Sequence, residues 1–201
     1  MEARIIDISR HRMGVDGKGV TTLVALSGCP LRCRYCLNPQ CLDERRGRKM
    51  STNALHEEVR KDHLYFLATG GGVTFGGGEP LLHSYFIQEF KEVCHPDWKV
   101  NIETSLNVPI EIVNSLAPIV DQWIIDIKDT NPLIYRAYTK KSNISALQNL
   151  KFLLSAGANI TVRVPHIPNF NTTENVAQSI RMLRDWGVNN IDEFTYIIRE
   201  K

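Results

Sequence analysis

The sequence predicts an α/β fold in which parallel strands alternate with helices, as an incomplete β/α barrel or an open Rossmann-type sheet. Short runs rich in β-branched residues alternate with segments of helical periodicity. Several of these runs are apolar on both faces, as parallel strands covered by helices should be. The chain has 201 residues, fewer than the roughly 250 of a complete eight-fold barrel. Periodicity alone does not decide whether the sheet closes.

Six strands and two well-marked helices are expected, and the parallel strands should bring their ligand-binding residues to the carboxyl edge. The strands are residues 21–26, 73–75, 99–103, 123–127, 160–164 and 192–197. The helical faces are Leu82, Phe86, Phe90 and Val93, and then Val176, Ile180 and Leu183. The expected helix ends are a capping box of Asn171 with Glu174, and left-handed caps at Gly157 and Gly187.

The composition is that of a globular chain with one core, and residues 1–201 are expected to form one domain. With 24 Lys and Arg against 22 Asp and Glu, the net charge is +2, which argues for neither a nucleic-acid footprint nor an acidic partner surface. No apolar run approaches the ~20 residues that cross a bilayer, and the first residues lack the apolar core of a secretory signal. We expect a cytoplasmic protein with no membrane partner.

Three cysteines, Cys29, Cys33 and Cys36, follow the first predicted strand within eight residues. In a reducing compartment such crowding indicates metal or redox chemistry. Three thiolates can hold three corners of a cubic iron–sulfur cluster, whereas ordinary clusters use four. The missing ligand leaves one iron open to chelate a substrate, by the logic that separates catalytic from closed structural zinc sites.

The alternative is a three-cysteine zinc site completed by His56, His63 or Cys41. The C-x3-C-x2-C spacing is less usual for zinc, which favours the cluster. Cys94 is expected to be a buried helix residue, and Cys41 a bystander near the loop.

Residues 74–80, Thr-Phe-Gly-Gly-Gly-Glu-Pro, end the second predicted strand. Consecutive glycines there can expose backbone groups to a ligand at close approach. A plain strand-to-helix turn would give the same sequence pattern. Polar residues also end the next strands, at Glu103, Thr104, Asp126, Lys128 and Arg163. Charged residues at strand ends usually mark the meeting of sheet and solvent. Their succession here indicates a common mouth, where Arg163 or Lys128 could bind the carboxylate of an amino acid-like ligand.

Together these motifs resemble the pyruvate formate-lyase activating enzymes, the glycyl-radical activases of the radical S-adenosylmethionine (SAM) superfamily. The resemblance runs from about Arg4 to the last residue and rests on the cysteine triplet with Tyr35, on Gly77-Gly78-Glu79, and on residues 15–19. The last segment, Val-Asp-Gly-Lys-Gly, matches the family's VDGPG, with Lys18 in place of proline.

The resemblance implies a partial (β/α)6 barrel of the radical SAM type, with Cys29, Cys33 and Cys36 on three irons of a [4Fe-4S] cluster and SAM on the fourth. It implies reductive cleavage of SAM and hydrogen abstraction from a glycine of a glycyl-radical enzyme, with a flavodoxin- or ferredoxin-type electron donor. The implied cofactor-binding residues are Tyr35, Leu37, Asn38, Gly77, Gly78, Glu79, Thr104, Asp126, Lys128 and Arg163. A monovalent cation is implied at Glu103, Thr104 and Asp126.

Two departures bear on the partner. The family's Asp-Thr-Asn-Gly reads Glu103-Thr104-Ser105-Leu106 here, and Ile197 stands where relatives often have a cofactor-contacting histidine. The alternatives are another radical SAM enzyme that acts on a small molecule or a peptide, an anaerobic ribonucleotide reductase activase, and a non-catalytic metal-stabilised binding module.

Overall fold

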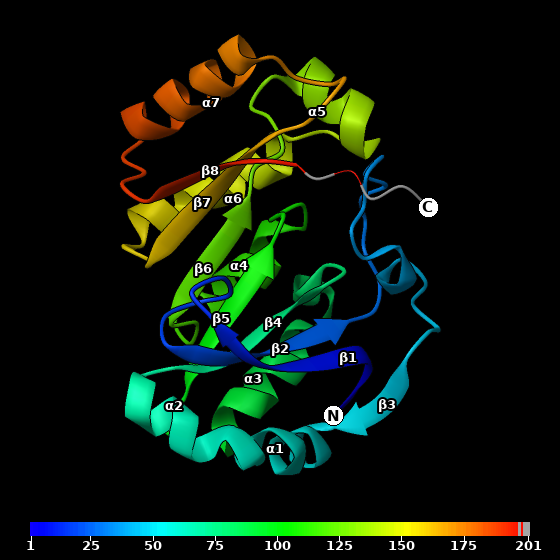
Figure 1. The fold of residues 1–201 in the computed structure, drawn as a ribbon, viewed down its shortest axis with the longest axis vertical. Coiled ribbons are helices and arrows are strands. Elements are labelled where there is room, and N and C mark those ends of the chain that lie inside the picture. Colours follow the sequence, from blue (N-terminus) through cyan, green and yellow to red (C-terminus); the bar gives the residue numbers. More distant parts are fainter. Residues whose placement is uncertain (197, 199–201) are drawn as a thin grey trace.

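The computed structural model describes residues 1–196 and residue 198, and its strands form one curved, open sheet (Figure 1). The strand order is β3-β1-β2-β4-β5-β6-β7-β8. The strands are β1 (Glu2–Met13), β2 (Val20–Leu26), β3 (Arg48–Ser51), β4 (Gly72–Gly77), β5 (Lys99–Thr104), β6 (Gln122–Asp126), β7 (Ile160–His166) and β8 (Ile191–Thr195).

The six predicted strands correspond to β2 and β4 to β8, which pair in parallel. This confirms the α/β class with an open partial barrel. The prediction missed β1 and β3, which add an antiparallel extension beside β2. The fourth strand ends at Asp126 rather than at residue 127. Tyr196 follows the end of β8, and Ile197, which the prediction placed in the last strand, lies outside the described residues.

Helices cover the outer, convex face of the sheet and close the main core against it (Figure 1). Side chains of parallel strands alternate between two faces, and the outer set is apolar and fully buried, as at Val24, Phe75, Ile102 and Trp123. Helix residues such as Phe90 complete this core. The helices are α1 (Thr52–Val59), α2 (His63–Thr69), α3 (Ser84–Val93), α4 (Ile110–Leu116), α5 (Pro132–Thr139), α6 (Ile144–Ser155) and α7 (Thr173–Asp185), with short 3-10 turns η1 (Pro39–Cys41), η2 (Arg60–Asp62) and η3 (Pro80–His83).

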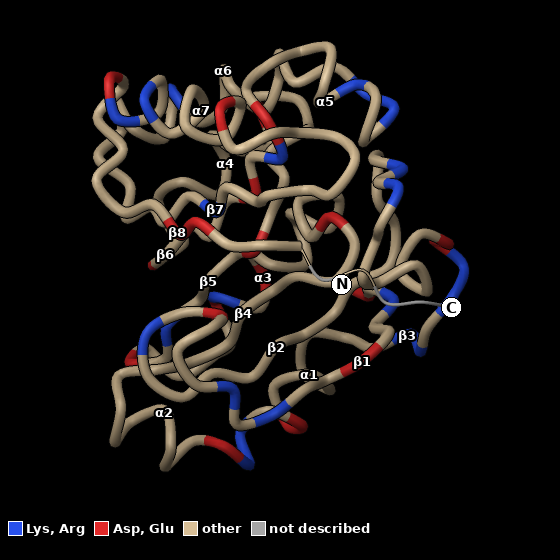
Figure 2. The backbone as a smooth tube through the Cα atoms, turned by 45° about the horizontal axis from the view of Figure 1, so that its top comes forward, with Lys and Arg blue, Asp and Glu red and all other residues tan. Residues whose placement is uncertain are grey.

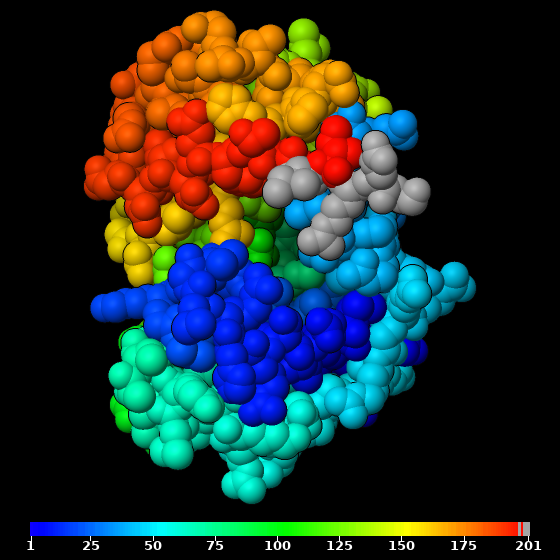
Figure 3. All heavy atoms as spheres, viewed as in Figure 1, coloured from blue at the N-terminus to red at the C-terminus, as the bar shows by residue number. Residues whose placement is uncertain are grey.

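The inner, concave face of the same strands is mostly polar. The strand register places its residues in rows that cross from β4 to β7. These residues are Thr74, Asn101, Glu103, Gln122, Ile124, Asp126, Thr161 and Arg163. The space-filling view shows the surface hollowed between the β1–β2 region, in blue, and β8, in red, with green residues visible inside the hollow (Figure 3). The polar face therefore lines a hollow that opens to solvent.

Three details of the helices differ from the sequence prediction. Thr172, not Asn171, caps α7, and its capping-box partner is Asn175. The buried face of α3 contains Phe86 and Phe90, but Leu82 and Val93 are exposed because Leu82 belongs to the preceding 3-10 turn and the helix ends at Val93.

The other predictions for helix faces and helix ends are confirmed. Val176 and Leu183 are buried on one face of α7, with Ile180 partly buried beside them. Gly157 and Gly187 have φ values of 69° and 94° just past their helices, as left-handed caps require. Among the described residues, no helix combines the length and the apolar character that crossing a membrane would need.

Candidate functional site

The loop that follows β2 carries the three cysteines, and neighbouring backbone holds its base firmly. We call residues 29–36 the cysteine loop. Gly28 donates its amide to the carbonyl of Cys41 at 2.7 Å and accepts the amide of Glu79 at 2.7 Å. Gly78 donates to the carbonyl of Leu26 at 3.0 Å. The cysteine loop therefore starts where the backbone segments that follow the parallel strands β2 and β4 are hydrogen-bonded to each other.

The far side of the cysteine loop is tied to the end of α5. The amide of Arg32 donates to the carbonyl of Thr139 at 2.9 Å, and the amide of Arg34 donates to that of Tyr138 at 3.1 Å. The Arg32 guanidinium folds back and donates to the carbonyl of Cys29 at 2.6 Å. With both ends held, the loop presents its thiols at the carboxyl edge of the sheet.

The thiols of Cys29, Cys33 and Cys36 are free and half-buried. Burial raises the pKa of Cys29 to about 12 and that of Cys33 to about 11, and the neighbouring loop thiols add to both shifts. The three sulfurs are thus near enough to influence one another. Burial disfavours the free thiolates of Cys29 and Cys33, but a bound metal would stabilise the deprotonated form.

The arrangement suits a cluster better than a single ion. In the described part of the chain, no three His, Cys, Asp or Glu side chains surround one point where a metal ion could be held. Ligands of a cubic cluster bind separate irons and do not need to meet at a point. The donor set of three half-buried thiols therefore fits the implied [4Fe-4S] group.

The histidines offered as zinc ligands lie elsewhere. His56 stacks on Trp98 with ring centroids 5.5 Å apart, and His63 accepts the indole N–H of Trp98 at 3.0 Å. Trp98 directly precedes β5, at the amino edge of the sheet. Cys41 lies buried beneath the cysteine loop, where burial and then Cys36 raise its pKa to about 11. Cys94 is buried as expected, although it caps α3 rather than belonging to it.

The glycines at the end of β4 are required by the chain's own packing. Gly77 has a φ of 95°, and a Cβ there would lie 2.7 Å from Cα of Ala25. A Cβ on Gly78 would lie 2.0 Å from the carbonyl oxygen of Gly28. The close approach predicted from sequence is therefore present, and its partner is the backbone that leads into the cysteine loop.

Glu79 connects the backbone contact at the ends of β2 and β4 to the end of β5. Its carboxylate is buried and accepts the hydroxyls of Thr104 and Ser105 at 2.6 Å each, the amide of Ser105 at 3.0 Å and the amide of Leu81 at 3.3 Å. Burial raises the pKa of Glu79, and these hydrogen bonds oppose the rise. The resemblance implied that Glu79 binds the cofactor, and in the structure its carboxylate accepts four internal donors.

Figure 2 marks where Lys, Arg, Asp and Glu lie along the backbone. Some of these residues form ion pairs on the inner face of the sheet. Arg163 donates to Glu103 at 2.6 Å, lies 3.7 Å from Asp192, and also donates to the carbonyl of Val15. Burial raises the pKa of Glu103 to about 7, Arg163 opposes that rise, and Asp126 adds to it. A single guanidinium, that of Arg163, thus contacts the carboxylates of Glu103 and Asp192 and the carbonyl of Val15.

A second pair joins the inner face to the cysteine loop. Lys128 donates to Asp126 at 2.9 Å. Burial alone would lower the pKa of Lys128, but Asp126 and then Cys33 raise it well above its ordinary value. The Lys128 ammonium lies 5.9 Å from the ring centre of Tyr196. Asp126 and Lys128 therefore face the same space as the Cys33 thiol.

The residues after Tyr35 are open to solvent, but Tyr35 itself is packed. Its ring lies edge-on to Phe170 at 5.7 Å and tilted against Tyr138 at 6.2 Å. Leu37 is 49% exposed, and the Asn38 amide donates to the carbonyl of Gly77 at 3.4 Å. The structure thus places Leu37 and Asn38 at the rim of the hollow and Tyr35 in an aromatic cluster that supports the loop.

Thr104 does not join Glu103 and Asp126. Adjacent strand residues point to opposite faces, so Thr104 turns to Glu79 while Glu103 faces Arg163. The cation site predicted from these three residues is divided between the two faces.

Sequence reasoning missed the residues that close the amino side of the hollow. The turn between β1 and β2 contains Asp16, which is buried and paired with Arg12. Its carbonyl accepts the Thr74 hydroxyl, and a Cβ on Gly17 would lie 2.4 Å from the Asn101 amide nitrogen. Asp16 and Gly17 belong to the motif at 15–19, so that motif was the available signal.

Comparisons with known proteins agree with this arrangement. The model of the family described as "Radical SAM superfamily" matches residues 23–183. Pyruvate formate-lyase 2-activating enzyme of Escherichia coli K12 is 32% identical, over 94% of this chain and 75% of that protein. The (2S)-3-sulfopropanediol dehydratase activating enzyme of Klebsiella oxytoca is also 32% identical, over 78% of this chain and 69% of that protein.

Solved structures share the fold at low identity. SuiB of Streptococcus suis, in a crystal structure with bound S-adenosylmethionine, superposes with a TM-score of 0.67 at 15% identity over 86% of this chain and 41% of SuiB. A structure of anSMEcpe with bound AdoMet gives a TM-score of 0.63 at 13% identity, over 87% of this chain and 51% of that one. The chain spans less than two thirds of either protein. These structures share the fold, whereas the family model and the 32% identical relatives show that the chain belongs to the radical SAM superfamily and to its pyruvate formate-lyase activating enzymes.

Proposed function

We propose that this chain is an activating enzyme that uses a [4Fe-4S] cluster and S-adenosylmethionine to abstract a hydrogen atom from a glycine of a partner glycyl-radical enzyme. Membership of the radical SAM superfamily implies both cofactors. The observation that carries the proposal is a loop with three half-buried thiols at the carboxyl edge of parallel strands, beside an open polar hollow. Relatives named as activating enzymes supply the class of partner.

In this proposal, Cys29, Cys33 and Cys36 hold three irons, and the cysteine loop fixes their positions. When bound, the cluster and S-adenosylmethionine supply one-electron chemistry that yields a carbon radical able to take a hydrogen atom. The protein excludes water and orients the reacting atoms. An open hollow suits a substrate that is a loop of another protein.

The inner-face charges would orient the cofactor's amino acid end. Lys128 and Arg163 offer cations for its carboxylate, and Asp126 offers an anion for its ammonium. Each of these side chains is already paired with an opposite charge, so it can exchange one ionic partner for another without leaving a charge unpaired. Leu37 and Asn38 at the rim would contact the adenosyl group, with Tyr35 packed behind them.

Gly77, Gly78 and Glu79 contribute differently in this proposal. The two glycines let the end of β4 pass under the cysteine loop, and the carbonyl of Gly77 remains within reach of the rim at Asn38. Glu79 holds the adjoining backbone of Thr104 and Ser105 in place. The monovalent cation predicted at Glu103, Thr104 and Asp126 could meet only the Glu103 and Asp126 side chains on the inner face, since Thr104 turns to Glu79, and it stays a prediction.

The partners and setting follow from the same proposal. We expect a flavodoxin- or ferredoxin-type electron donor, no nucleic-acid or membrane partner, a cytoplasmic location and a single domain over residues 1–201.

Anaerobic reconstitution tests the proposal. The wild-type chain should bind iron and sulfide, and should form 5′-deoxyadenosine from S-adenosylmethionine with dithionite as reductant. A matched pair of variants sharpens the ligand assignment: Cys33→Ala should lose the cluster, and Cys94→Ala should keep it. Iron retained in Cys33→Ala and lost in Cys94→Ala would overturn the assignment. The class of partner is checked by a glycyl radical signal in electron paramagnetic resonance spectra of the partner.

A further inference from the structure

A dense basic segment follows the cysteine loop and includes the first two residues of β3. Residues 45–49 read Arg-Arg-Gly-Arg-Lys, although the whole chain has a net charge of only +2. All four basic side chains are exposed, and that of Arg45 is 91% exposed. Asp43, 3.5 Å from Arg45, and the neighbouring Glu44 offset two of these four charges. We call Arg45, Arg46, Arg48 and Lys49 the basic surface.

The basic surface is joined to the base of the cysteine loop by short contacts. The Ser27 hydroxyl donates to the carbonyl of Glu44 at 3.3 Å, and a Cβ on Gly28 would lie 3.1 Å from Cγ of Glu44. Arg4 of β1 donates to the carbonyl of Gly47 at 3.1 Å. The segment is thus fixed against the backbone that enters the cysteine loop.

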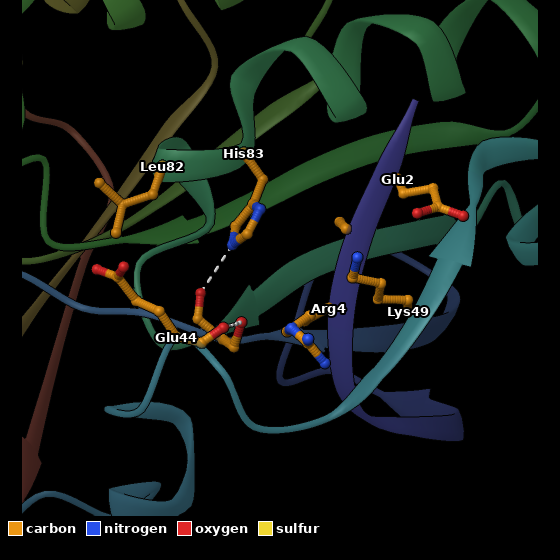
Figure 4. Close-up of a pocket in the computed structure, with 8 residues that line it drawn as sticks. Glu2, Arg4, Glu44, Lys49, Leu82 and His83 are labelled. Atoms are coloured by element: carbon orange, nitrogen blue, oxygen red, sulfur yellow. Dashed lines mark hydrogen bonds between the residues drawn. The ribbon is translucent and has the colours of Figure 1, made fainter.

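A cavity of about 540 Å³ lies at this junction (Figure 4). Its wall combines Arg4 and Lys49 with Ser27, and with His83 from the other side. The His83 ring donates to the carbonyl of Ser27 at 2.7 Å. Glu2 and Glu44 also line the cavity, so the outside of the cysteine loop base offers a partner a concave surface of mixed charge beside the exposed side chains of Arg45, Arg46 and Arg48.

We infer that the basic surface docks an acidic one-electron donor protein of the flavodoxin or ferredoxin type. The inference rests on the proposed function, in which the glycine-bearing partner occupies the polar hollow. A donor then needs another approach to the cluster, and the outer side of the cysteine loop provides one. In the transfer, the reduced donor loses one electron and the cluster gains it.

The charge pattern favours an acidic protein over nucleic acid. Clustered basic side chains steer an oppositely charged protein and set its orientation. Sites for single-stranded nucleic acid add aromatic side chains on which bases stack, and residues 42–49 contain no aromatic residue. Nucleic acid remains as an outcome of the test.

The experiment compares two double charge reversals in the reconstituted enzyme. Arg45→Glu with Arg46→Glu changes the basic surface, and Arg181→Glu with Arg184→Glu makes the same change in net charge on exposed positions of α7. Binding of a purified acidic flavodoxin and of a ferredoxin is measured by calorimetry at low and at physiological ionic strength. The first variant should bind the donor about tenfold more weakly at low ionic strength with a smaller salt dependence, and the control should match wild type.

Reduction of the cluster is followed in parallel, with the reduced donor and with dithionite. The first variant should be slower with the donor protein alone, because dithionite does not need the docking surface. Equal donor affinity and rate in wild type and the first variant would overturn the inference, as would the absence of donor binding to wild type. Binding of a single-stranded RNA probe that is lost in the first variant, with donor binding unchanged, would assign the surface to nucleic acid. If dithionite yields no 5′-deoxyadenosine in wild type, the proposed function fails, whatever the donor binding shows.

Discussion

Two carboxylates at neighbouring strand ends, Glu79 and Glu103, have opposite surroundings. Glu79 is buried among neutral donors, the hydroxyls of Thr104 and Ser105 and two backbone amides. Glu103 faces a cation, Arg163, with further negative charges nearby. The resemblance implied that Glu79 binds the cofactor and that Glu103 binds a monovalent cation.

The difference separates a region that supports the cysteine loop from a region that can bind the cofactor. A carboxylate saturated by fixed backbone and hydroxyl donors has no position left for a ligand, so the Glu79 region holds the backbone around the cysteine loop. Ion pairs on an open polar face can exchange partners, so the Glu103–Arg163 region can accept the charged end of a cofactor. Substitutions in the first region should therefore reduce stability and cluster loading together, whereas those in the second should chiefly affect cofactor binding and pH dependence.

The largest effect is expected from Gly78→Ala. The added Cβ would lie 2.0 Å from the carbonyl oxygen of Gly28, and neither backbone can move without disturbing the cysteine loop. We expect a loss of about 3 kcal/mol in unfolding free energy and reduced iron loading. Urea denaturation and iron analysis measure these two changes.

Gly157→Ala is the matched control. Its Cβ would meet no atom within 4 Å, although its φ of 69° disfavours a side chain. The expected cost is about 1 kcal/mol with normal iron loading. Equal losses of stability and iron loading in the two variants would mean that the backbone contact at the ends of β2 and β4 does not constrain the cysteine loop.

Glu79→Gln should come next, at about 2 kcal/mol. A glutamine carries one acceptor oxygen and one amide nitrogen, but the two carboxylate oxygens of Glu79 each face a backbone N–H, from Leu81 and from Ser105. Hydroxyls can rotate to accept, whereas a backbone N–H cannot, so one buried donor is left unpaired. Denaturation of the metal-free chain measures the cost, and a neutral result would contradict the supporting role of Glu79.

The strands that carry the site could be predicted from sequence because they are short runs dominated by β-branched residues. Residues 160–164, for example, read Ile-Thr-Val-Arg-Val and form the greater part of β7. In contrast, β1 buries few of its side chains, such as Ala3 and Ile5, and the remainder of its twelve residues are partly or fully exposed. Its weak alternation resembles that of a polar segment, which is why the antiparallel edge was missed.

The candidate site was predicted as a set of residues but not as a geometry. The cysteines, Asp126, Lys128 and Arg163 reach one edge because parallel strands place their carboxyl ends together. Which face each residue takes depends on strand register, which no local motif contains. Thr104 is the clearest case: it follows Glu103 directly, yet it belongs to the opposite face and to a different network.

Arg163→Lys tests the region that can bind the cofactor, with a smaller expected effect. Lysine keeps the positive charge toward Glu103 but loses the fork that also contacts Asp192 and the carbonyl of Val15. We expect a stability loss of about 1 kcal/mol with normal iron loading, and weaker S-adenosylmethionine binding by calorimetry. Unchanged cofactor affinity would remove Arg163 from the proposed binding set.

A further effect, visible only when stability is compared across pH, is expected in the pH dependence that Glu103 contributes. Burial raises the pKa of Glu103 from 4.5 to about 7 against the opposing charge of Arg163. The folded chain then binds more protons than the unfolded chain between these values, so the stability from this group is full below about pH 4.5 and is lost as the pH rises through about 7. Glu103→Gln keeps an acceptor for Arg163 and cannot titrate. The unfolding free energy of wild type relative to this variant should therefore fall by about 1 to 3 kcal/mol between pH 5 and pH 8, as measured by urea denaturation of the metal-free chains. Curves that stay parallel would show that Arg163 holds Glu103 ionised throughout, and the pair would then be as fixed as the hydrogen bonds of Glu79.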